Sequence, residues 1–199
     1  NKIDIPSAAI ADISGCHKCG LCDNVCPENI PISYLLSMLS SKVVKSTKVE
    51  IPVALNLAEK EPFKNIYDPN SDYVLWVGSL LVNNLGYVET VARLLSKSKV
   101  KFRIIDTDIS SGFYDFISGN KEAINEVFNK VSEVLSSASL VVTLTPEDYK
   151  ALTDFFYQLS SIYGVKKLRK IEVLPIENLI FSLDFNIEGN NEEINLHIP

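Results

Sequence analysis

Short apolar runs alternate with amphipathic segments from Tyr73 onward. Such runs predict buried strands, and apolar residues three or four positions apart predict helices. This alternation is typical of an α/β fold with an open, mostly parallel sheet. The expected strands are Tyr73–Val77, Phe102–Ile105 and Leu140–Leu144, the expected helices are Leu85–Ser96, Lys121–Ser136 and Pro146–Tyr163, and Ile171–Leu174, Ile176–Leu183 and Ile194–Ile198 complete the series.

Details of this series can be predicted as well. Trp76 is expected in the core, because it lies inside an apolar strand. The segment Asp106–Asn120 is expected to be a loop. Four residues of the helix Pro146–Tyr163 are expected to face inward, namely Tyr149, Leu152, Phe156 and Leu159.

The chain before Tyr73 has a different character. Apolar residues at helical spacing predict a helix over Ser33–Ser41, and Ser33 is a suitable N-cap. Three prolines and a Lys/Glu-rich centre predict a connector, with one short helix near Val53–Glu59. We therefore expect a small helical segment over residues 1–45, a connector over 46–72 and a Rossmann-like α/β domain, with helices on both faces of its sheet, over 73–199.

The four cysteines of the chain all lie within eleven residues: Cys16, Cys19, Cys22 and Cys26. Cysteines packed so closely cannot close the long loops from which disulfides gain their stabilisation. Their spacing, C-x2-C-x2-C-x3-C followed by Pro27, is the run that binds iron–sulfur clusters in bacterial-type ferredoxins. The sequence therefore predicts these four cysteines as metal ligands of a 4Fe–4S cluster.

Zinc is the alternative metal. Four-thiolate zinc sites pair two C-x-x-C knuckles across a longer spacer, and that spacer is absent here. His17, beside a predicted ligand, is expected to be an exposed spacer, with a fourth-ligand or proton-coupled redox role as the alternative.

The fourth ligand raises a question, because in two-cluster ferredoxins the last cysteine of such a run binds the other cluster. The sequence has no second run and no fifth cysteine. Cys26 could complete the same cluster, or another polypeptide could supply the ligand. Two copies of the chain could exchange Cys26 across a twofold axis. An open iron site or a three-iron cluster is a further alternative.

The charge and hydropathy of the chain argue against two classes of protein, namely nucleic-acid-binding proteins and membrane-spanning proteins. Nineteen basic and 25 acidic residues give a net charge of −6, which argues against a nucleic-acid-binding protein. No apolar stretch approaches the ~20 residues of a membrane span, and the first residues lack a signal core. We therefore expect a cytoplasmic protein with no membrane span.

Polar residues follow three of the predicted strands, where ligands bind in parallel sheets. They are Ser79, Ser110, Ser111 and Asp148. Turn and capping roles explain them, with Thr145 as an N-cap before Pro146; a ligand-binding crevice is the alternative. His197 and the basic cluster Lys166, Lys167, Arg169 and Lys170 are expected at the surface, with a docking patch as the alternative for the cluster.

The run Cys16–Pro27, with the following Glu28–Ile32, resembles the second half of the helical ferredoxin domain in a family of iron–sulfur subunits. This family includes subunits of heterodisulfide reductase, glycolate oxidase and anaerobic glycerol-3-phosphate dehydrogenase. Its cysteine-rich domain carries Gly-Cys, Cys-Cys-Gly and Cys-Pro-x-Cys-Tyr after successive strands. This chain has Gly78-Ser79, Ser110-Ser111-Gly112 and Thr145-Pro146-Glu147-Asp148-Tyr149 at the matching places, and Asn195–Pro199 resembles the step that opens the family's second cysteine-rich domain.

The resemblance has clear departures. Ser, Thr or Asp replaces every cysteine of the cysteine-rich domain, and hard oxygen donors substitute poorly for thiolates on iron–sulfur centres. The family's disulfide-reducing site therefore does not carry over. The resemblance implies a non-catalytic electron-transfer subunit whose partners are other redox subunits, either a flavoprotein or a ferredoxin-like protein. The alternative function is a non-redox structural or assembly adaptor with a zinc or structural cluster site.

Overall fold

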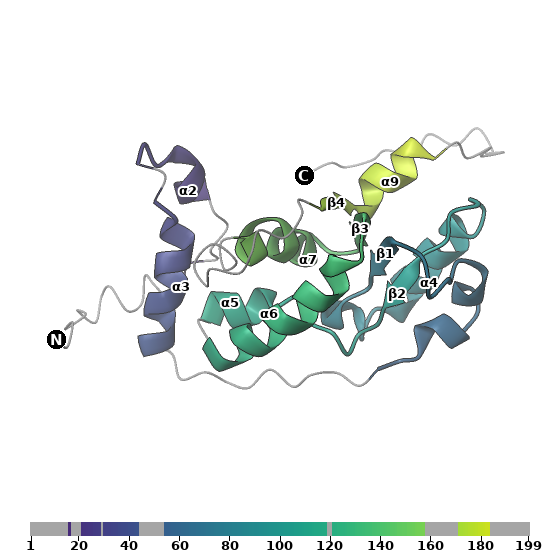
Figure 1. Cartoon of the computed structure of the whole chain (residues 1–199), viewed down its shortest axis with the longest axis horizontal. Coiled ribbons are helices and arrows are strands. Elements are labelled where there is room, and N and C mark those ends of the chain that lie inside the picture. The colour runs from purple at the N-terminus through teal and green to yellow at the C-terminus, as the bar shows by residue number, and fades with distance from the viewer. Residues whose placement is uncertain are drawn as a thin grey trace.

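The computed structural model describes residues 16, 21–28, 30–43, 54–118, 121–157 and 171–183 of the 199-residue chain. Figure 1 shows these residues as a central sheet flanked by helices, with the first helices at one end. None of the helices in the described residues combines the length and the hydropathy of a membrane span.

The sheet has four parallel strands in the order β2-β1-β3-β4. Val74 of β1 pairs with Arg103 of β2 on one side and with Val141 of β3 on the other. The predicted α/β class and the parallel sheet are therefore confirmed. The strands are β1 (Tyr73–Trp76), β2 (Arg103–Ile105), β3 (Leu140–Thr143) and β4 (Glu172–Pro175).

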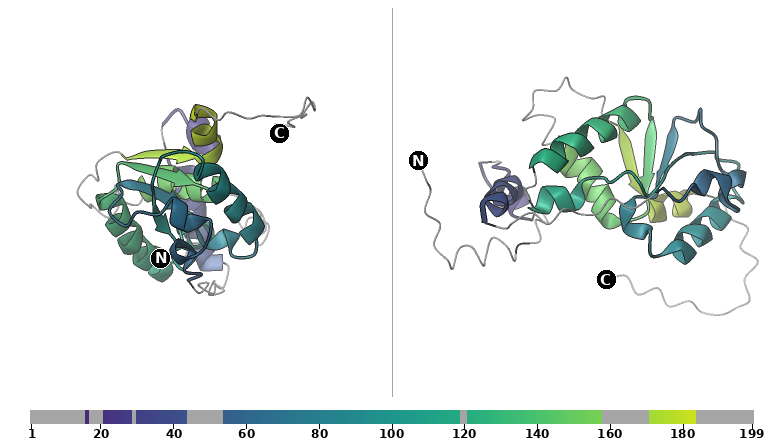
Figure 2. Two further views of the ribbon diagram at one scale, coloured as in Figure 1. Left: turned by 90° about the vertical axis from the view of Figure 1, so that its right-hand side faces the viewer. Right: turned by 90° about the horizontal axis from the view of Figure 1, so that it is seen from below.

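Helices cover both faces of this sheet (Figure 2). Alternate residues of a strand point to opposite faces, so Trp76 packs toward one helical layer and Leu75 toward the other. The first layer consists of α5 (Phe113–Ser118), α6 (Lys121–Ser136), α7 (Pro146–Lys150) and its π-helical continuation η4 (Ala151–Phe155). The second layer consists of α4 (Leu85–Leu95), α9 (Ile176–Ser182), the 3-10 helix η3 (Ser79–Leu81) and two further 3-10 helices described below.

Most of the predicted helices are present. The prediction for α6 matches its bounds, and α4 ends one residue earlier than expected. Trp76 lies fully buried in the core, as predicted. The described part of the helix predicted over Pro146–Tyr163 is helical to residue 157, and Leu159 lies outside the described residues.

Two local predictions are wrong. The expected loop Asp106–Asn120 contains helix α5, whose Phe116 is buried against the first layer. Tyr149 is 36% exposed rather than inward, because Asp148, one position earlier, takes the inward place on α7. In both cases tertiary packing decides which residues of a short segment are buried.

The described part of the predicted connector, residues 54–72, packs against the α4 side of the sheet. Three of its apolar side chains are buried there: Leu57, Phe63 and Ile66. The carboxylate of Asp106 accepts a hydrogen bond of 2.9 Å from Leu57 N. The expected short helix is the 3-10 helix η1 (Leu57–Glu59), and a second one, η2 (Phe63–Asn65), follows it.

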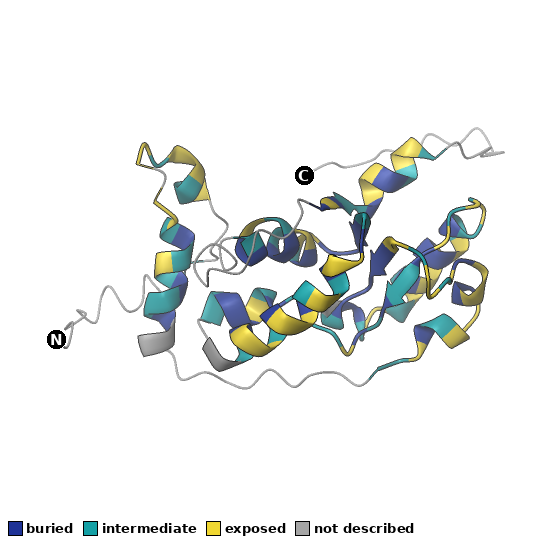
Figure 3. Cartoon of the chain, viewed as in Figure 1, coloured by how far each residue is buried: buried dark blue, intermediate teal, exposed yellow. Residues whose placement is uncertain are grey.

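The N-terminal segment consists of α2 (Leu21–Val25) and α3 (Ile32–Val43). Helix α3 packs on α5 and does not reach the sheet (Figures 1 and 2). Tyr34 of α3 contacts Phe116 with 5.8 Å between ring centroids, and Met38 packs on the same cluster. Helix α2 has no buried residue, and its surface is open in Figure 3.

The stacked pair Phe116 and Phe155 gives a first prediction. Phe116 is 1% exposed, and its ring lies 3.7 Å from that of Phe155. Phe116→Ala should lower the free energy of unfolding by about 3–5 kcal/mol, because it leaves a cavity between α3, α5 and η4. Tyr114→Ala, on the exposed side of the same helix, should cost less than about 1 kcal/mol in the same urea titration. Equal losses in the two variants would contradict this packing.

Candidate functional site

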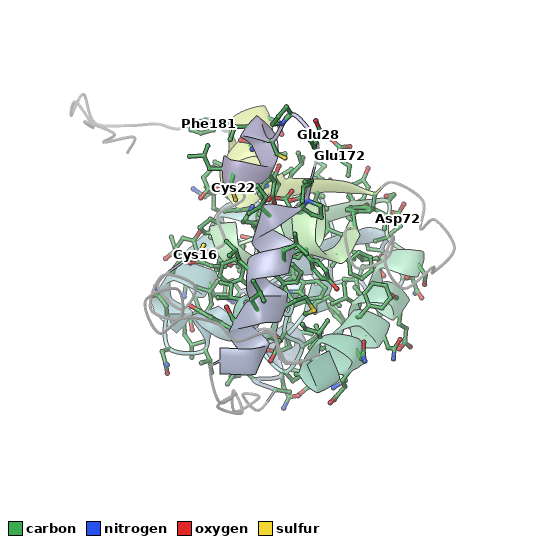
Figure 4. The ribbon with its side chains drawn as sticks, turned by 90° about the vertical axis from the view of Figure 1, so that its left-hand side faces the viewer. Cys16, Cys22, Glu28, Asp72, Glu172 and Phe181 are labelled. Carbon is green, nitrogen blue, oxygen red and sulfur yellow. The ribbon has the colours of Figure 1, made fainter. Side chains whose placement is uncertain are left out.

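The predicted cluster ligands lie at the α2 end of the molecule. Cys22 is the second residue of α2, Cys26 follows the last residue of that helix, and both are half-buried free thiols. Cys16 is also half-buried, and Figure 4 shows it apart from Cys22. Cys19 and His17 lie outside the described residues.

A backbone amide points at the sulfur of Cys26. Ile30 N donates to Cys26 Sγ at 3.4 Å, across the turn that contains Pro27 and Glu28. The Cys26 amide itself donates to the carbonyl of Asp23, also at 3.4 Å. Amide-to-sulfur hydrogen bonds of this kind stabilise the charge of thiolate ligands and tune the metal centre.

Asp23 joins the two helices of the segment. One carboxylate oxygen accepts a 2.8 Å hydrogen bond from Ser33 N, and the other accepts the hydroxyl of Ser33. Helix α3 begins at Ile32, so the prediction of Ser33 as its N-cap is wrong. The acceptor for the unpaired amides of the first turn comes instead from a side chain ten residues earlier.

The electrostatics of this segment follow from the same contacts. Partial burial favours the neutral form of Asp23, but hydrogen bonds from Ser33, Cys22 and Ile32 outweigh it and lower the pKa of Asp23. Cys22 Sγ donates to Asp23 Oδ1 at 3.6 Å. Partial burial, followed by the charge and hydrogen bond of Asp23, raises the pKa of the Cys22 thiol. Asp23 thus keeps a negative charge beside a predicted ligand.

The chemistry of these donors fits a thiolate-bound metal centre. Cys22 and Cys26 are four residues apart, which is about one helical turn. Residues at this spacing lie on the same side of a helix. Both are free thiols, and the second already accepts an amide hydrogen. Among the residues that the structure describes, which exclude Cys19, no three His, Cys, Asp or Glu side chains form a group that could hold a metal ion.

The polar residues at the carboxyl ends of the strands do come together. Asp148 is 1% exposed, and its carboxylate accepts a 2.7 Å hydrogen bond from Thr145 Oγ1 and a further bond from Ser111. Thr145 also caps α7, as predicted, by accepting from Asp148 N at 3.1 Å. Gly78 adopts a φ of +75° directly under this carboxylate. Three loops that are distant in sequence are thus tied to one buried side chain.

In the described part of the chain, the carboxylate at the centre of the alternative ligand-binding crevice is enclosed by protein. Asp148 and Thr145 are buried and hydrogen-bonded to each other. Ser110 makes a hydrogen bond within its own loop, where its hydroxyl oxygen accepts from Gly112 N at 3.0 Å. Ser111 and Gly112 border a cavity of about 20 Å³, lined otherwise by apolar residues such as Phe116 and Val127, which has room for roughly one water molecule.

Other predicted residues lie outside the described part of the chain, namely His197, the final segment Ile194–Ile198 and the basic cluster Lys166, Lys167, Arg169 and Lys170. Asp23 was not among the predicted site residues. Its partner, Ser33, lies beyond the turn after α2, so no local spacing in the sequence marks the contact.

No protein-family model matches the chain, and neither a curated protein nor a solved structure matches it. The family resemblance of Cys16–Pro27 therefore stays a prediction.

Gly78 gives a second prediction. A Cβ atom at this position would overlap Oδ2 of Asp148, and the positive φ is unfavourable for other residues. Gly78→Ala should therefore lower the free energy of unfolding by about 2–4 kcal/mol. Gly86→Ala is the matched control, because nothing lies within 4 Å of its Cβ position in helix α4. That variant should be neutral or up to about 1 kcal/mol more stable in the same denaturant titration.

Asp148 gives a third prediction. Burial, more than any other factor, raises the pKa of Asp148 to about 6, from 3.8. Because the folded pKa is the higher one, the carboxyl is tolerated best below pH 3.8, destabilises the fold increasingly as the pH rises from 3.8 to about 6, and has a constant effect above that. The advantage of Asp148→Asn over the parent in free energy of unfolding should grow by up to about 3 kcal/mol between pH 4 and pH 7.5. Urea titrations across this range measure it, and a pH-independent difference would contradict it.

Proposed function

We propose that this chain is an iron–sulfur electron-transfer protein, or a subunit of a larger oxidoreductase, which binds one 4Fe–4S cluster through Cys16, Cys19, Cys22 and Cys26. The observation that carries the proposal is the spacing of these four cysteines before Pro27. The free, half-buried thiols of Cys22 and Cys26 are compatible with it, as is the amide hydrogen directed at Cys26 Sγ. When bound, such a cluster supplies reversible one-electron transfer.

The position of the cysteine segment supports a role in docking to a redox partner. Helix α2 stands at the end of the molecule, and its apolar residues Leu21 and Val25 are 68% and 72% exposed. These side chains are four residues apart and so lie on one side of the helix. Electron-transfer encounters use small interfaces, which a patch of this kind beside a cluster could provide. The proposed partner is another redox subunit, either a flavoprotein or a ferredoxin-like protein.

The α/β body supports the proposed membership of the heterodisulfide-reductase-like family. The order β2-β1-β3-β4, with helices on both faces, suits a Rossmann-like sheet with its switch point between β1 and β3. Ser111, Thr145 and Asp148 stand where the family resemblance expects cysteines, and they meet beside Gly78. We propose that this body is a degenerate cysteine-rich domain and the α2–α3 segment one half of a helical ferredoxin domain.

In this proposal the chain performs no substrate chemistry of its own. Of the groups at the positions where the family resemblance expects cysteines, Thr145 and Asp148 are buried and bonded to each other. The body therefore acts as a scaffold that carries the cysteine segment. Cys26 either completes the cluster of its own chain or serves a cluster shared with a second copy or another subunit. A cytoplasmic location stays a prediction.

Metal content gives the fourth prediction. Anaerobically prepared protein should contain about four iron atoms and four sulfides per chain, and its brown colour should bleach with dithionite. Cys22→Ser should lose most of the iron, because a hydroxyl is a poor ligand for the cluster. Asn24→Ser, an exposed position on the same helix, is the control and should retain it. Iron, sulfide and zinc analysis, with visible absorption spectra, measures these contents.

The same preparation separates the alternatives. A colourless protein with one zinc atom per chain would replace the electron-transfer proposal with the structural adaptor. A protein with neither metal would contradict both. Solution mass then locates the fourth ligand: four irons in a monomer indicate that Cys26 completes its own cluster, whereas a dimer that loses iron on dilution indicates sharing.

A further inference from the structure

The cysteine helix has no apolar anchor of its own. Helix α2 is five residues long and has no buried residue. A helix of this length is unstable in isolation, so contacts with other elements must hold it. Its neighbour in the described structure is α3, and the side-chain hydrogen bonds between the two helices run from Ser33 to Asp23.

Ser33 holds the carboxylate of Asp23 with two hydrogen bonds. Its side chain is 1% exposed, and both its amide and its hydroxyl donate to the carboxylate of Asp23. The amide belongs to the first turn of α3, where a negative charge is favoured. Helix α3 is held in turn by the contact of Tyr34 with Phe116 in the core. Asp23 therefore connects the cysteine helix, through α3, to the α/β body of the protein.

The same carboxylate lies beside a predicted ligand. Asp23 Oδ1, which accepts the amide of Ser33, is 3.6 Å from Cys22 Sγ. A metal-bound Cys22 is a thiolate and cannot donate a hydrogen bond. The two hydrogen bonds from Ser33 would nevertheless hold the carboxylate in place, so its charge would remain close to the sulfur. A nearby negative charge opposes the addition of an electron to a cluster.

We infer that Asp23 is a positioning residue that fastens the cysteine helix to α3 and, through its fixed charge beside Cys22, keeps the reduction potential of the bound cluster low. This inference rests on the proposed function. It needs no contact between Asp23 and the metal, because the residue acts through the position of α2 and through charge alone.

The charge is tested by the midpoint potential of the anaerobic, cluster-loaded protein, titrated by electron paramagnetic resonance. Asp23→Asn removes the charge and keeps an oxygen that can accept from Ser33 N. It should raise the midpoint potential by the equivalent of about a tenfold change in the oxidised-to-reduced ratio, which is about 59 mV for one electron. Glu28→Gln removes an exposed carboxylate from the same segment and should shift the potential far less. Ser33→Ala keeps the charge and should also shift it less than Asp23→Asn.

The fastening is tested on the metal-free, reduced protein by amide hydrogen exchange. The Ser33 amide should exchange about tenfold faster in Asp23→Ala, since it loses a charged acceptor. It should be unchanged in Glu28→Gln. An unchanged rate in Asp23→Ala would overturn the fastening role, whatever metal the protein binds.

The outcomes separate this inference from the proposed function. A loaded cluster whose potential is the same in Asp23→Asn and in Glu28→Gln overturns the charge effect alone. A protein that binds no cluster overturns the proposed function, and the effect on potential with it. Faster exchange of Ser33 in such a protein would still support the fastening role.

Discussion

A parallel sheet has apolar side chains on both of its faces, and both must be covered for the sheet to be stable. In this protein, α5, α6 and α7 with η4 cover one face, and α4, α9 and the 3-10 helices of residues 54–72 cover the other. The body is therefore built around strands of three or four residues whose side chains are mostly buried. The most deeply buried carboxylate among the described residues, Asp148, lies beyond the end of a strand, and the cysteine helix is attached outside the helical layers.

The strand ends show how such a body accommodates a polar cluster. Asp148 is buried at the switch between β1 and β3, where parallel sheets leave a gap between diverging loops. Here Gly78, Ser111 and Thr145 close that gap around the carboxylate. The raised pKa of Asp148 is the physical cost of this burial. At this place, where many parallel sheets bind ligands, the buried carboxylate of Asp148 joins three loops of this protein.

The cysteine segment is attached by a different kind of contact. Helix α3 rests on the outer side of α5, one helical layer away from the sheet, through Tyr34 and Met38. Helix α2 is linked to α3 by the polar contacts of Asp23. Helix α2 has no buried residue, and its thiols Cys22 and Cys26 are only half-buried. This suits a segment proposed to exchange electrons with a partner.

Features that depend on residues close together in the sequence could be predicted, whereas features that depend on contacts between distant segments could not. The strands and the helices α4 and α6 could be predicted because apolar periodicity is a local property of the chain. Helix α5 could not be predicted, since six residues are too few to show a helical repeat of apolar residues. Phe116 is buried in part by the ring of Phe155, which stacks on it. The N-cap of α7 could be predicted because Thr145 and Asp148 are only three residues apart. The acceptor at the start of α3 could not be predicted in this way, because it comes from Asp23, across a turn.

Local patterns along the chain are therefore enough to predict the α/β class, the strands, the longer helices and the four thiols with their spacing, because each of these is set by neighbours a few positions apart. Three features depend on the folded chain: Asp148 lies over Gly78, Asp23 joins α2 to α3 beside Cys22, and residues 54–72 contribute apolar side chains to the core. The contacts from Asp148 to Gly78 and from Asp23 to Ser33 join residues seventy and ten positions apart, so they depend on how the chain folds back on itself.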